Sequence, residues 1–351
     1  MSSTPGTTAT VRSQARFRGW MPLAFLALLV VGMGAYAAIT KDSFLTEYNI
    51  RNLLLTTMPL ALVSIGQTNA LLVGGFDVSV AALVTLCVVT ASYTMTAGSA
   101  WYALLAGALA LVGVGLATGV LNATLIRVLG LPSIIATLGT LSILQGVSLL
   151  LRDHPEGAIS NEFASAMTQS IGFMPIAFIG VIVLAAVWDL WLYRRRGGLS
   201  MRAVGLDETS ARRLGTNTGR VLFMAFVVCS LMAAVAGFFS ASLIQTGSPI
   251  IGGYALQSIV AAVLGGASLA GGKGSFLGAV LAALFLSLIL NVLPLLQVPT
   301  EYGQIAIGGL TLLALVLYQG PELWARLRSF LGDLRTSRAG RVAPGPESPT
   351  A

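Results

Sequence analysis

The clearest pattern along the chain is an alternation of long apolar runs with short polar segments that carry nearly all of the charges. A membrane-spanning helix needs roughly 20 apolar residues, so charge-free runs can be counted as spans. Two long runs, 78–126 and 221–272, each suffice for two helices. Runs that suffice for one helix each cover residues 19–40, 52–76, 128–151, 163–188, 274–300 and 302–321. The pattern predicts an all-α, polytopic integral membrane protein of about ten transmembrane helices.

Turn-forming residues divide the two longest runs. Gly98 and Ser99 fall near the middle of the first run. The second run is interrupted by the segment 247–253, which contains Pro249 and three glycines. Glycine and proline are the strongest local breakers of regular structure. We therefore expect a helix on each side of both interruptions.

The positions of Lys and Arg orient these spans. An even number of spans puts both termini on one side of the membrane. With the N-terminus inside, the inner segments hold 17 of the 20 Lys and Arg residues, seven of them in the loop 194–220. Cytoplasmic loops of membrane proteins carry such an excess of positive charge. The sequence thus predicts that both termini and the loop 194–220 are cytoplasmic.

Composition removes most other classes of protein. Hydrophobic residues make up 56% of the 351 residues and charged residues only 9%, against about 25% charged in a soluble domain. No basic folded domain remains to bind nucleic acid, so the net charge of +7 reflects topology and membrane lipid is the expected surrounding. One His and two Cys remove most metal-site and thiol chemistry, and no GxxxxGK[ST] or HExxH motif occurs. We expect no catalytic residues, no metal and no cofactor on this chain.

The chain divides into one large membrane domain and two tails. Residues 1–19 and 336–351 are rich in Ser, Thr, Ala, Gly, Pro and Arg, which is typical of disordered segments. We expect a disordered cytoplasmic N-terminal tail over 1–19 and a mostly disordered cytoplasmic tail over 321–351. The transmembrane domain is then 20–320, with its largest inner loop at 194–220.

Residues 64–80 combine a helix break with buried polar side chains. Gly74 and Gly75 end one helix, and Asp77 is placed to cap the next one. Under the alternative interpretation, Gln67, Asn69 and Asp77 line a polar path, because amides inside a span face the bundle or a cavity. We favour the structural turn and keep Gln67 and Asn69 as candidate lining residues.

Two further segments have the same two interpretations. Small and polar residues at Thr137 and Thr140, with Asn122 on the preceding span, form either a helix contact or part of a path for a polar solute. Gly265 and Gly266, six residues before a second glycine pair, permit a sharp turn or close helix packing. Packing is the commoner explanation for both segments.

The inner loop contains a short helix with matched ends. Asp207 can cap a helix over Glu208–Leu214, and Gly215 follows its C-terminal end. The acid at its start and Arg212 near its end suit the helix dipole. A capped, charged helix on the inner face can dock a soluble partner, and an ordinary surface loop is the alternative.

These segments together resemble the permease subunit of bacterial ABC sugar importers of the ribose, xylose and galactose type. The resemblance covers roughly residues 40–320, with the segments in the family's order. The Gly-Gly-Phe-Asp-Val-Ser-Val run at 74–80, the Pro-Ser-Ile-Ile-Ala-Thr-Leu-Gly-Thr run at 132–140 and the Leu-Gly-Gly-Ala-Ser-Leu-Ala-Gly-Gly-Lys-Gly-Ser run at 264–275 are each similar to a family motif. Gln145 stands where the family commonly has an Arg.

The resemblance implies a site of interaction with an ATPase. The inner loop is similar to the family's ATPase-docking loop, although Leu206, Ser210 and Thr216 depart from its usual pattern. The residues that the resemblance assigns to docking are Ala203, Gly205, Asp207, Glu208, Ala211, Arg212 and Gly215.

The resemblance also implies a mechanism and partners. Two permeases, identical or sister chains, pair around a pathway in the bacterial inner membrane, and an extracytoplasmic sugar-binding protein delivers a monosaccharide. ATP and Mg²⁺ bind only the partner ATPase subunit. The same machine could carry a nucleoside, an autoinducer sugar or a branched-chain amino acid. A proton-coupled secondary transporter fits less well, because the spans offer almost no titratable groups at mid-membrane.

Overall fold

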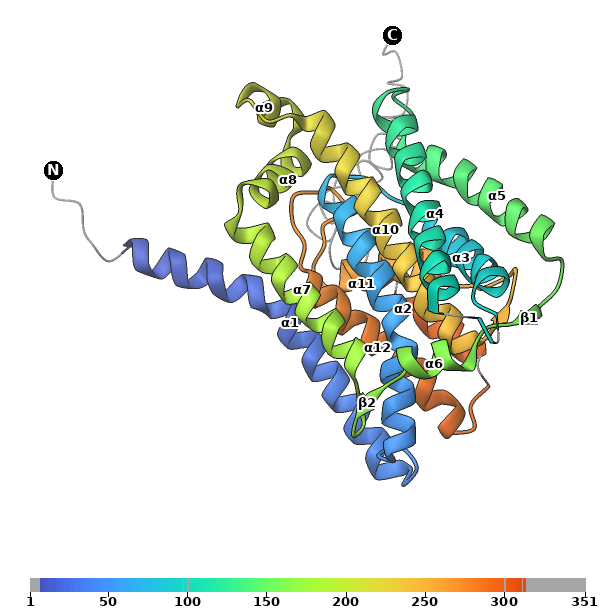
Figure 1. The fold of residues 1–351 in the computed structure, drawn as a ribbon. Coiled ribbons are helices and arrows are strands. Elements are labelled where there is room, and N and C mark those ends of the chain that lie inside the picture. The colour runs from blue at the N-terminus through green and yellow to red at the C-terminus, as the bar shows by residue number, and fades with distance from the viewer. Residues whose placement is uncertain (1–6, 97, 100, 300, 311, 314–351) are drawn as a thin grey trace, which may run out of the picture. The chain divides into compact units, whose positions relative to one another are not determined.

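The computed structural model describes residues 7–96, 98–99, 101–299, 301–310 and 312–313, with side chains from residue 23 onward. The chain forms two units, 1–307 and 308–351. The first unit contains every helix and strand named below (Figure 1).

Helices dominate the first unit. The long helices are α1 (Thr7–Thr40), α2 (Glu47–Leu72), α3 (Val80–Thr94), α4 (Trp101–Arg127), α5 (Ser133–Leu151), α7 (Ile176–Arg194), α10 (Thr218–Ile244) and α12 (Phe276–Leu295). The short helices are α6 (Asn161–Met167), α8 (Arg196–Leu206), α9 (Glu208–Arg213) and α11 (Tyr254–Leu264). Residues 301–307 at the end of this unit are also helical, as are residues 308–310 and 312–313 of the second unit. Two small antiparallel sheets pair β1 (Glu156–Ala158) with β4 (Thr246–Gly247), and β2 (Ser170–Ile171) with β3 (Met174–Pro175).

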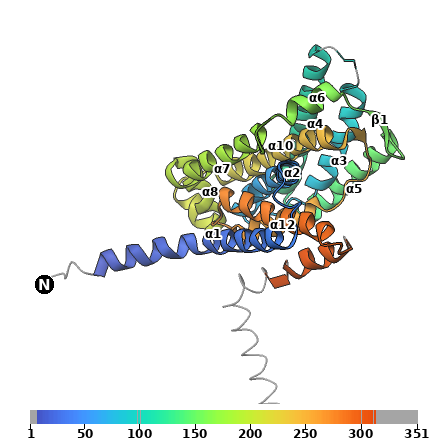
Figure 2. The same ribbon diagram turned by 90° about the horizontal axis from the view of Figure 1, so that it is seen from below.

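Helix α2 lies at the centre of this unit. Nearly all of its residues from Leu53 to Leu72 are buried. Helices α10 and α12 pack along it (Figure 2), and α11 also packs against it. A helix that is apolar on all sides belongs in the interior of a bundle. Gly66 brings α2 close to α10, because a Cβ there would lie 2.8 Å from the carbonyl oxygen of Cys229. The core is therefore built around α2 and α10.

The helical class is confirmed, but the number of spans is not. Within the described residues, six helices are long and apolar enough to cross a membrane. Helix α11 has 11 residues, which at 1.5 Å per residue covers about half of a ~30 Å hydrocarbon layer. The run 221–272 thus holds one long helix and one half-length helix. Of the span expected at 302–321, residues 311 and 314–321 lie outside the described residues.

The run 163–188 also folds differently from the prediction. Its first part forms α6 and the β2–β3 hairpin, and the long helix α7 begins only at Ile176, directly after Pro175. Proline suits the start of a helix and not its interior. Counting charge-free residues cannot separate such an uncharged connection from a span.

The structure describes part of the predicted N-terminal tail but none of the predicted C-terminal tail. Helix α1 extends back to Thr7, within the stretch 1–19 for which the sequence predicts disorder. Extending an existing helix costs far less than nucleating one, which favours this continuation. The C-terminal tail predicted at 321–351 lies outside the described residues.

Candidate functional site

A polar groove of about 600 Å³ lies between α2, α11, α12 and the helical segment that follows α12. Its walls come from one face of each helix. The lining residues are Asn49, Asn52, Thr56, Leu60, Gly252, Tyr254, Gln257, Ser287, Leu290, Asn291, Pro294, Leu295 and Gln304. None of these described lining residues carries a charge. Neutral amides and hydroxyls supply both donors and acceptors, so the groove suits an uncharged polar solute.

Two of the amides in the groove join helices that are distant in the sequence. Asn49 Nδ2 donates to Asn291 Oδ1 at 3.2 Å, and Asn291 Nδ2 donates to Asn49 Oδ1 at 3.0 Å. Asn49 Nδ2 also donates to the carbonyl oxygen of Phe44. Asn52 and Thr56, in contrast, have exposed side chains that face the groove. One wall is therefore fixed by a reciprocal pair while neighbouring polar groups stay accessible.

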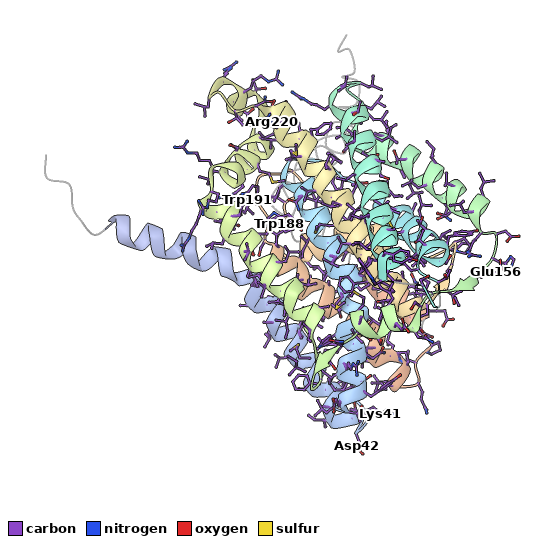
Figure 3. The ribbon with its side chains drawn as sticks, in the orientation of Figure 1. Lys41, Asp42, Glu156, Trp188, Trp191 and Arg220 are labelled. Atoms are coloured by element: carbon purple, nitrogen blue, oxygen red, sulfur yellow. The ribbon has the colours of Figure 1, made fainter. Side chains whose placement is uncertain are left out.

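The groove lies at the end of α2 that is far from the charged loop 194–220. Its α2 residues come from the first half of that helix. The last residue of α2, Leu72, accepts a hydrogen bond from Gly272 N at 2.9 Å and contacts Gly205 of α8. Figure 3 shows the same separation, with Lys41 and Asp42 at the opposite end from Arg220. The polar groove and the charged loop thus occupy opposite ends of the first unit.

A second group of polar residues is buried and fully paired. Asn122 Nδ2 donates to Ser79 Oγ at 2.8 Å, and Thr140 Oγ1 donates to Asn122 Oδ1 at 2.7 Å. Asp77 accepts hydrogen bonds from Ser79, from Asn122 and from Ser230. These five residues form what we call the Asp77 cluster, which ties together α3, α4, α5 and α10. Buried polar groups are tolerated in this way when each has a partner.

The predicted lining residues are therefore not brought together in one cavity. Asn122 and Thr140 belong to the Asp77 cluster, and Thr137 is buried and donates to the carbonyl oxygen of Ser133 at 2.8 Å. Asn69 donates to the carbonyl oxygen of Ile65 and borders a different cavity. Gln67 is fully buried, and its side-chain amide has no hydrogen-bond partner among the described residues. None of the five is among the residues that line the polar groove.

The prediction that Asp77 caps the next helix is wrong. Helix α3 begins at Val80, so Ser79 occupies the N-cap position. Asp77 lies two residues before Ser79 and accepts a hydrogen bond from Ser79 N at 3.0 Å. Ser79 makes no side-chain capping hydrogen bond at this position, because its hydroxyl donates to Asp77. The carboxylate is then free to accept hydrogen bonds from α4 and α10.

The glycine turns lie where the sequence predicts them. Gly74 and Gly75 end α2 by donating to the carbonyl oxygens of Leu71 and Ala70. Gly265 and Gly266 end α11.

The charged loop contains the capped helix expected from its sequence. Helix α9 covers Glu208–Arg213, one residue shorter than predicted, and Asp207 accepts from the backbone N–H groups of Thr209 and Ser210. The side-chain and backbone hydrogen bonds from Ser210 lower the pKa of Asp207. Gly215 has a φ of +83° and closes the helix with the two hydrogen bonds of a Schellman motif.

Glu208 anchors α9 to the transmembrane helices. Its Oε1 lies 2.9 Å from Arg127 Nη1 at the end of α4 and 2.7 Å from Arg212 Nη2. Partial burial by itself raises the pKa of Glu208, but hydrogen bonds from Thr218, Arg212 and Arg127 outweigh it, so the pKa is lowered. The short helix is thereby held to both α4 and α10.

The surface of the loop is mixed in character. Leu206 and Leu214, which flank α9, are 64% and 85% exposed, while Ala211 beneath them is buried. Two large exposed apolar side chains beside arginines are typical of a surface that binds another protein. Gly205 packs against the end of α2 instead, and the carbonyl oxygen of Ala203 accepts a hydrogen bond from Asp207 N.

Sequence reasoning missed the groove, although only Asn49 of its α2 residues precedes the charge-free run that begins at residue 52. A signal was nevertheless present. Asn49, Asn52 and Thr56 follow one another at i, i+3 and i+7, and Ser287 and Asn291 at i and i+4. Each set places polar side chains on one helix face. Only the packing of α2 against α12 shows that the two faces share one cavity.

Comparison with known proteins supplies the class. A family model described as "Branched-chain amino acid transport system / permease component" matches residues 49–315. The D-allose transport system permease protein AlsC of Escherichia coli K12 is 29% identical over 321 residues, which are 89% of this chain and 98% of that protein.

Permeases of another import system are similarly related. The autoinducer 2 import system permease protein LsrC of Shigella flexneri is 35% identical over 298 residues, covering 82% of this chain and 83% of that protein. The LsrC protein of Yersinia enterocolitica is 32% identical over 330 residues, with 92% and 88% covered. No solved structure matches the chain.

Proposed function

The chain belongs to the family of branched-chain amino acid transport system permease components, and from this premise we propose that it forms the translocation pathway of an ABC importer for a monosaccharide. The resemblance to sugar-importer permeases is confirmed by its relatives, which are named for transport of D-allose and import of autoinducer 2. The chain is a multi-pass membrane permease.

The chemistry of the polar groove is the single observation that favours a sugar. A sugar presents neutral hydroxyls, which amides and hydroxyls such as those of Asn52, Gln257 and Gln304 can bind. A branched-chain amino acid is zwitterionic, and moving its charges out of water requires charged or dipolar partners. None of the described lining residues of the groove supplies a formal charge. The groove therefore fits a monosaccharide better than an amino acid.

The charged loop is the proposed site of ATPase docking. Asp207 and Gly215 fix the two ends of α9, while Arg213, Leu206 and Leu214 are exposed for contact. No Walker-type phosphate loop occurs in the sequence, so the proposed mechanism places ATP binding and hydrolysis on the partner subunit. This orientation makes the loop and both termini cytoplasmic, and the distribution of 17 of 20 Lys and Arg supports it.

The structure contains a continuous route between the two ends. Gly205 of α8 packs against Leu72 at the end of α2, so closely that a Cβ would lie 1.8 Å from the Leu72 oxygen. Tyr193 donates to the carbonyl oxygen of Gly274, and Asp189 of α7 accepts from Phe276 N at the start of α12. A shift of the charged loop 194–220 would therefore move α2 and α12, which line the groove.

The groove is open along one side, and we propose that a second permease copy, identical or sister, completes it. A solute-binding protein then delivers the sugar at the groove end of the molecule, and ATP-driven closure at the loop end exposes the pathway to the cytoplasm. Helix α2 contacts elements that are distant in the sequence, and its internal Pro59 interrupts the helical hydrogen-bond ladder. Both features suit a helix that carries movement from the loop end to the groove end.

Uptake by cells that express the complete importer tests the proposal. We expect radiolabelled D-allose or autoinducer 2 to accumulate in an ATP-dependent manner, and L-leucine not to accumulate. The variant Asn52→Leu should reduce uptake, while the ATPase still co-purifies at the wild-type level. Leucine uptake that depends on this chain would refute the monosaccharide as substrate but leave the ABC-importer mechanism standing. Uptake driven by a proton gradient without ATP would reject the importer as well.

A further inference from the structure

A second cavity, of about 290 Å³, lies between α7, α8 and α10 near the charged loop. We call it the inner slot. It is nearly twice the volume of the ~150 Å³ apolar cavity that binds benzene in an engineered protein. Its principal walls are Trp188, Trp191, Met201, Met224 and Val228, with Arg220 and Asn69 of α2 also bordering it. The sugar pathway proposed above does not include any of these residues.

The slot is an apolar space with an opening toward the surface. Met201 is buried at its inner wall, whereas Met224 is 52% exposed at its rim. Trp188 is held in place against Phe276, with ring centroids 5.7 Å apart. Asn69 is the one neutral amide among the described lining residues, and its Nδ2 donates to the carbonyl oxygen of Ile65. A cavity with so few partners for ordered water favours an apolar occupant. Methionine and tryptophan surfaces bind flexible hydrocarbon well.

The height of the slot in the membrane is set by its aromatic residues. Trp188 and Trp191 lie in the last two turns of α7, just before the arginines at 194–196. Tryptophan is enriched at the membrane–water interface, with its ring at the level of the lipid headgroups. Figure 3 shows these two tryptophans below Arg220, at the end of the molecule that carries the charged loop. The slot therefore lies at headgroup depth.

The charges beside the slot are positive and unpaired. Arg220, Arg194, Arg195 and Arg196 are exposed, and within the described residues no acidic side chain forms an ion pair with them. The acid nearest in sequence, Asp189, is engaged with Ser275 and the start of α12. Clusters of arginine at a membrane surface attract anionic headgroups.

We propose that the inner slot binds an anionic phospholipid from the leaflet that faces the loop 194–220, with one acyl chain between Trp188, Met224 and Val228 and its phosphate at Arg220. The apolar walls select hydrocarbon, and the arginine selects the negative headgroup. Because α7, α8 and α10 all contribute walls, a bound lipid braces the docking loop against the transmembrane helices.

Native mass spectrometry of the full-length chain tests this proposal. Detergent-purified protein is incubated with equal amounts of phosphatidylglycerol and phosphatidylcholine, and retained lipid is counted. We expect phosphatidylglycerol to be retained in preference. Arg220→Ala should reduce its retention about fivefold, the effect of one arginine near a charged surface. The matched control Arg213→Ala, an exposed arginine on α9, should leave retention unchanged. Equal loss in both variants, or no preference in the wild type, would overturn the proposal.

A second measurement on the wild-type protein tests the location of the acyl chain. Phosphatidylglycerol with a brominated acyl chain should quench tryptophan fluorescence more strongly than brominated phosphatidylcholine. That difference should vanish in the double variant Trp188→Phe/Trp191→Phe. Val228→Trp, which fills the slot, should remove the retention of both lipids. A quenching difference that persists without Trp188 and Trp191 would place the lipid elsewhere and refute the inner slot.

Discussion

The polar groove and the Asp77 cluster both place amide and hydroxyl side chains inside a membrane protein, but they differ in how those groups are satisfied. In the cluster, Asn122 is fully buried and bonded to Ser79, Asp77 and Thr140. In the groove, Asn52 is exposed and faces open space. Polar groups that satisfy one another hold helices together, while those left accessible remain free to bind a solute. The presence of a polar residue in a span does not by itself distinguish these roles.

The largest expected effect is on stability, from removal of the acceptor at the centre of the cluster. Asp77→Leu leaves the buried donors of Ser79 and Ser230 without their acceptor, at about 1–3 kcal/mol for each, while Asn122 keeps its hydrogen bond to Ser79. We expect a large fall in the thermal stability of the purified permease, and Asp77→Asn, which keeps one acceptor oxygen, should lose less. Asn52→Leu in the groove is the control and should change stability by less than ~0.5 kcal/mol. Similar melting curves for Asp77→Leu and wild type would refute the structural role of the cluster.

The next effect is on transport and concerns the groove. Asn52→Leu or Gln257→Leu removes one neutral hydrogen bond to the solute, about 0.5–1.5 kcal/mol, and should reduce uptake roughly two- to tenfold. Thr137→Val, which changes a buried side chain outside the groove, is the matched control. If Thr137→Val reduces uptake while Asn52→Leu and Gln257→Leu leave it unchanged, the solute passes through another part of the molecule.

A smaller effect is expected at the docking loop. Gly215 has φ = +83°, and a β-branched residue in that region is strained by about 1–2 kcal/mol. Gly215→Val should insert normally yet retain less ATPase on co-purification and show weaker stimulation of ATP hydrolysis. Gly215→Asn, which tolerates this conformation better, should be closer to wild type. Wild-type ATPase retention in Gly215→Val would make the loop an ordinary surface.

The smallest effect concerns pH. The pKa values of Asp207 and Glu208 are both lowered in the folded loop, so their stabilising contribution is complete above the ordinary values of about 3.9 and 4.3 and is lost as the pH falls below them. ATPase association should be unaffected by these groups between about pH 5 and 8. Loss of association between pH 7 and 6 that disappears in Glu208→Gln would contradict this assignment.

The sequence predicts those features that depend on neighbours along the chain. The cap at Asp207, the end of α9 at Gly215 and the breaks at 98–99 and 247–253 follow from local conformational preferences, and the structure confirms each. Most long helices also follow from hydrophobic length. Local signals fail at the start of α3, where Ser79 takes the N-cap position and Asp77 accepts hydrogen bonds from the distant residues Asn122 and Ser230.

The location of the pathway depends on packing, which no local signal contains. Thr140 and Asn52 look alike in the sequence, since each is a polar residue near apolar ones. Thr140 meets Asn122 across a helix interface, whereas Asn52 lies beside the gap between α2 and α12. Which partner a side chain meets is decided by helices that are far apart in the sequence.

Cysteine accessibility tests the central claim most directly, because the two native cysteines, Cys87 and Cys229, are fully buried. Single cysteines at Asn52 and Gln257 report on the groove, and one at Asn122 reports on the Asp77 cluster. A membrane-impermeant thiol reagent applied outside intact cells should modify the two groove positions and block uptake, while the cysteine at Asn122 stays unreacted. Rapid modification at Asn122 with no reaction at Asn52 and Gln257 would contradict the account and put the pathway through the cluster.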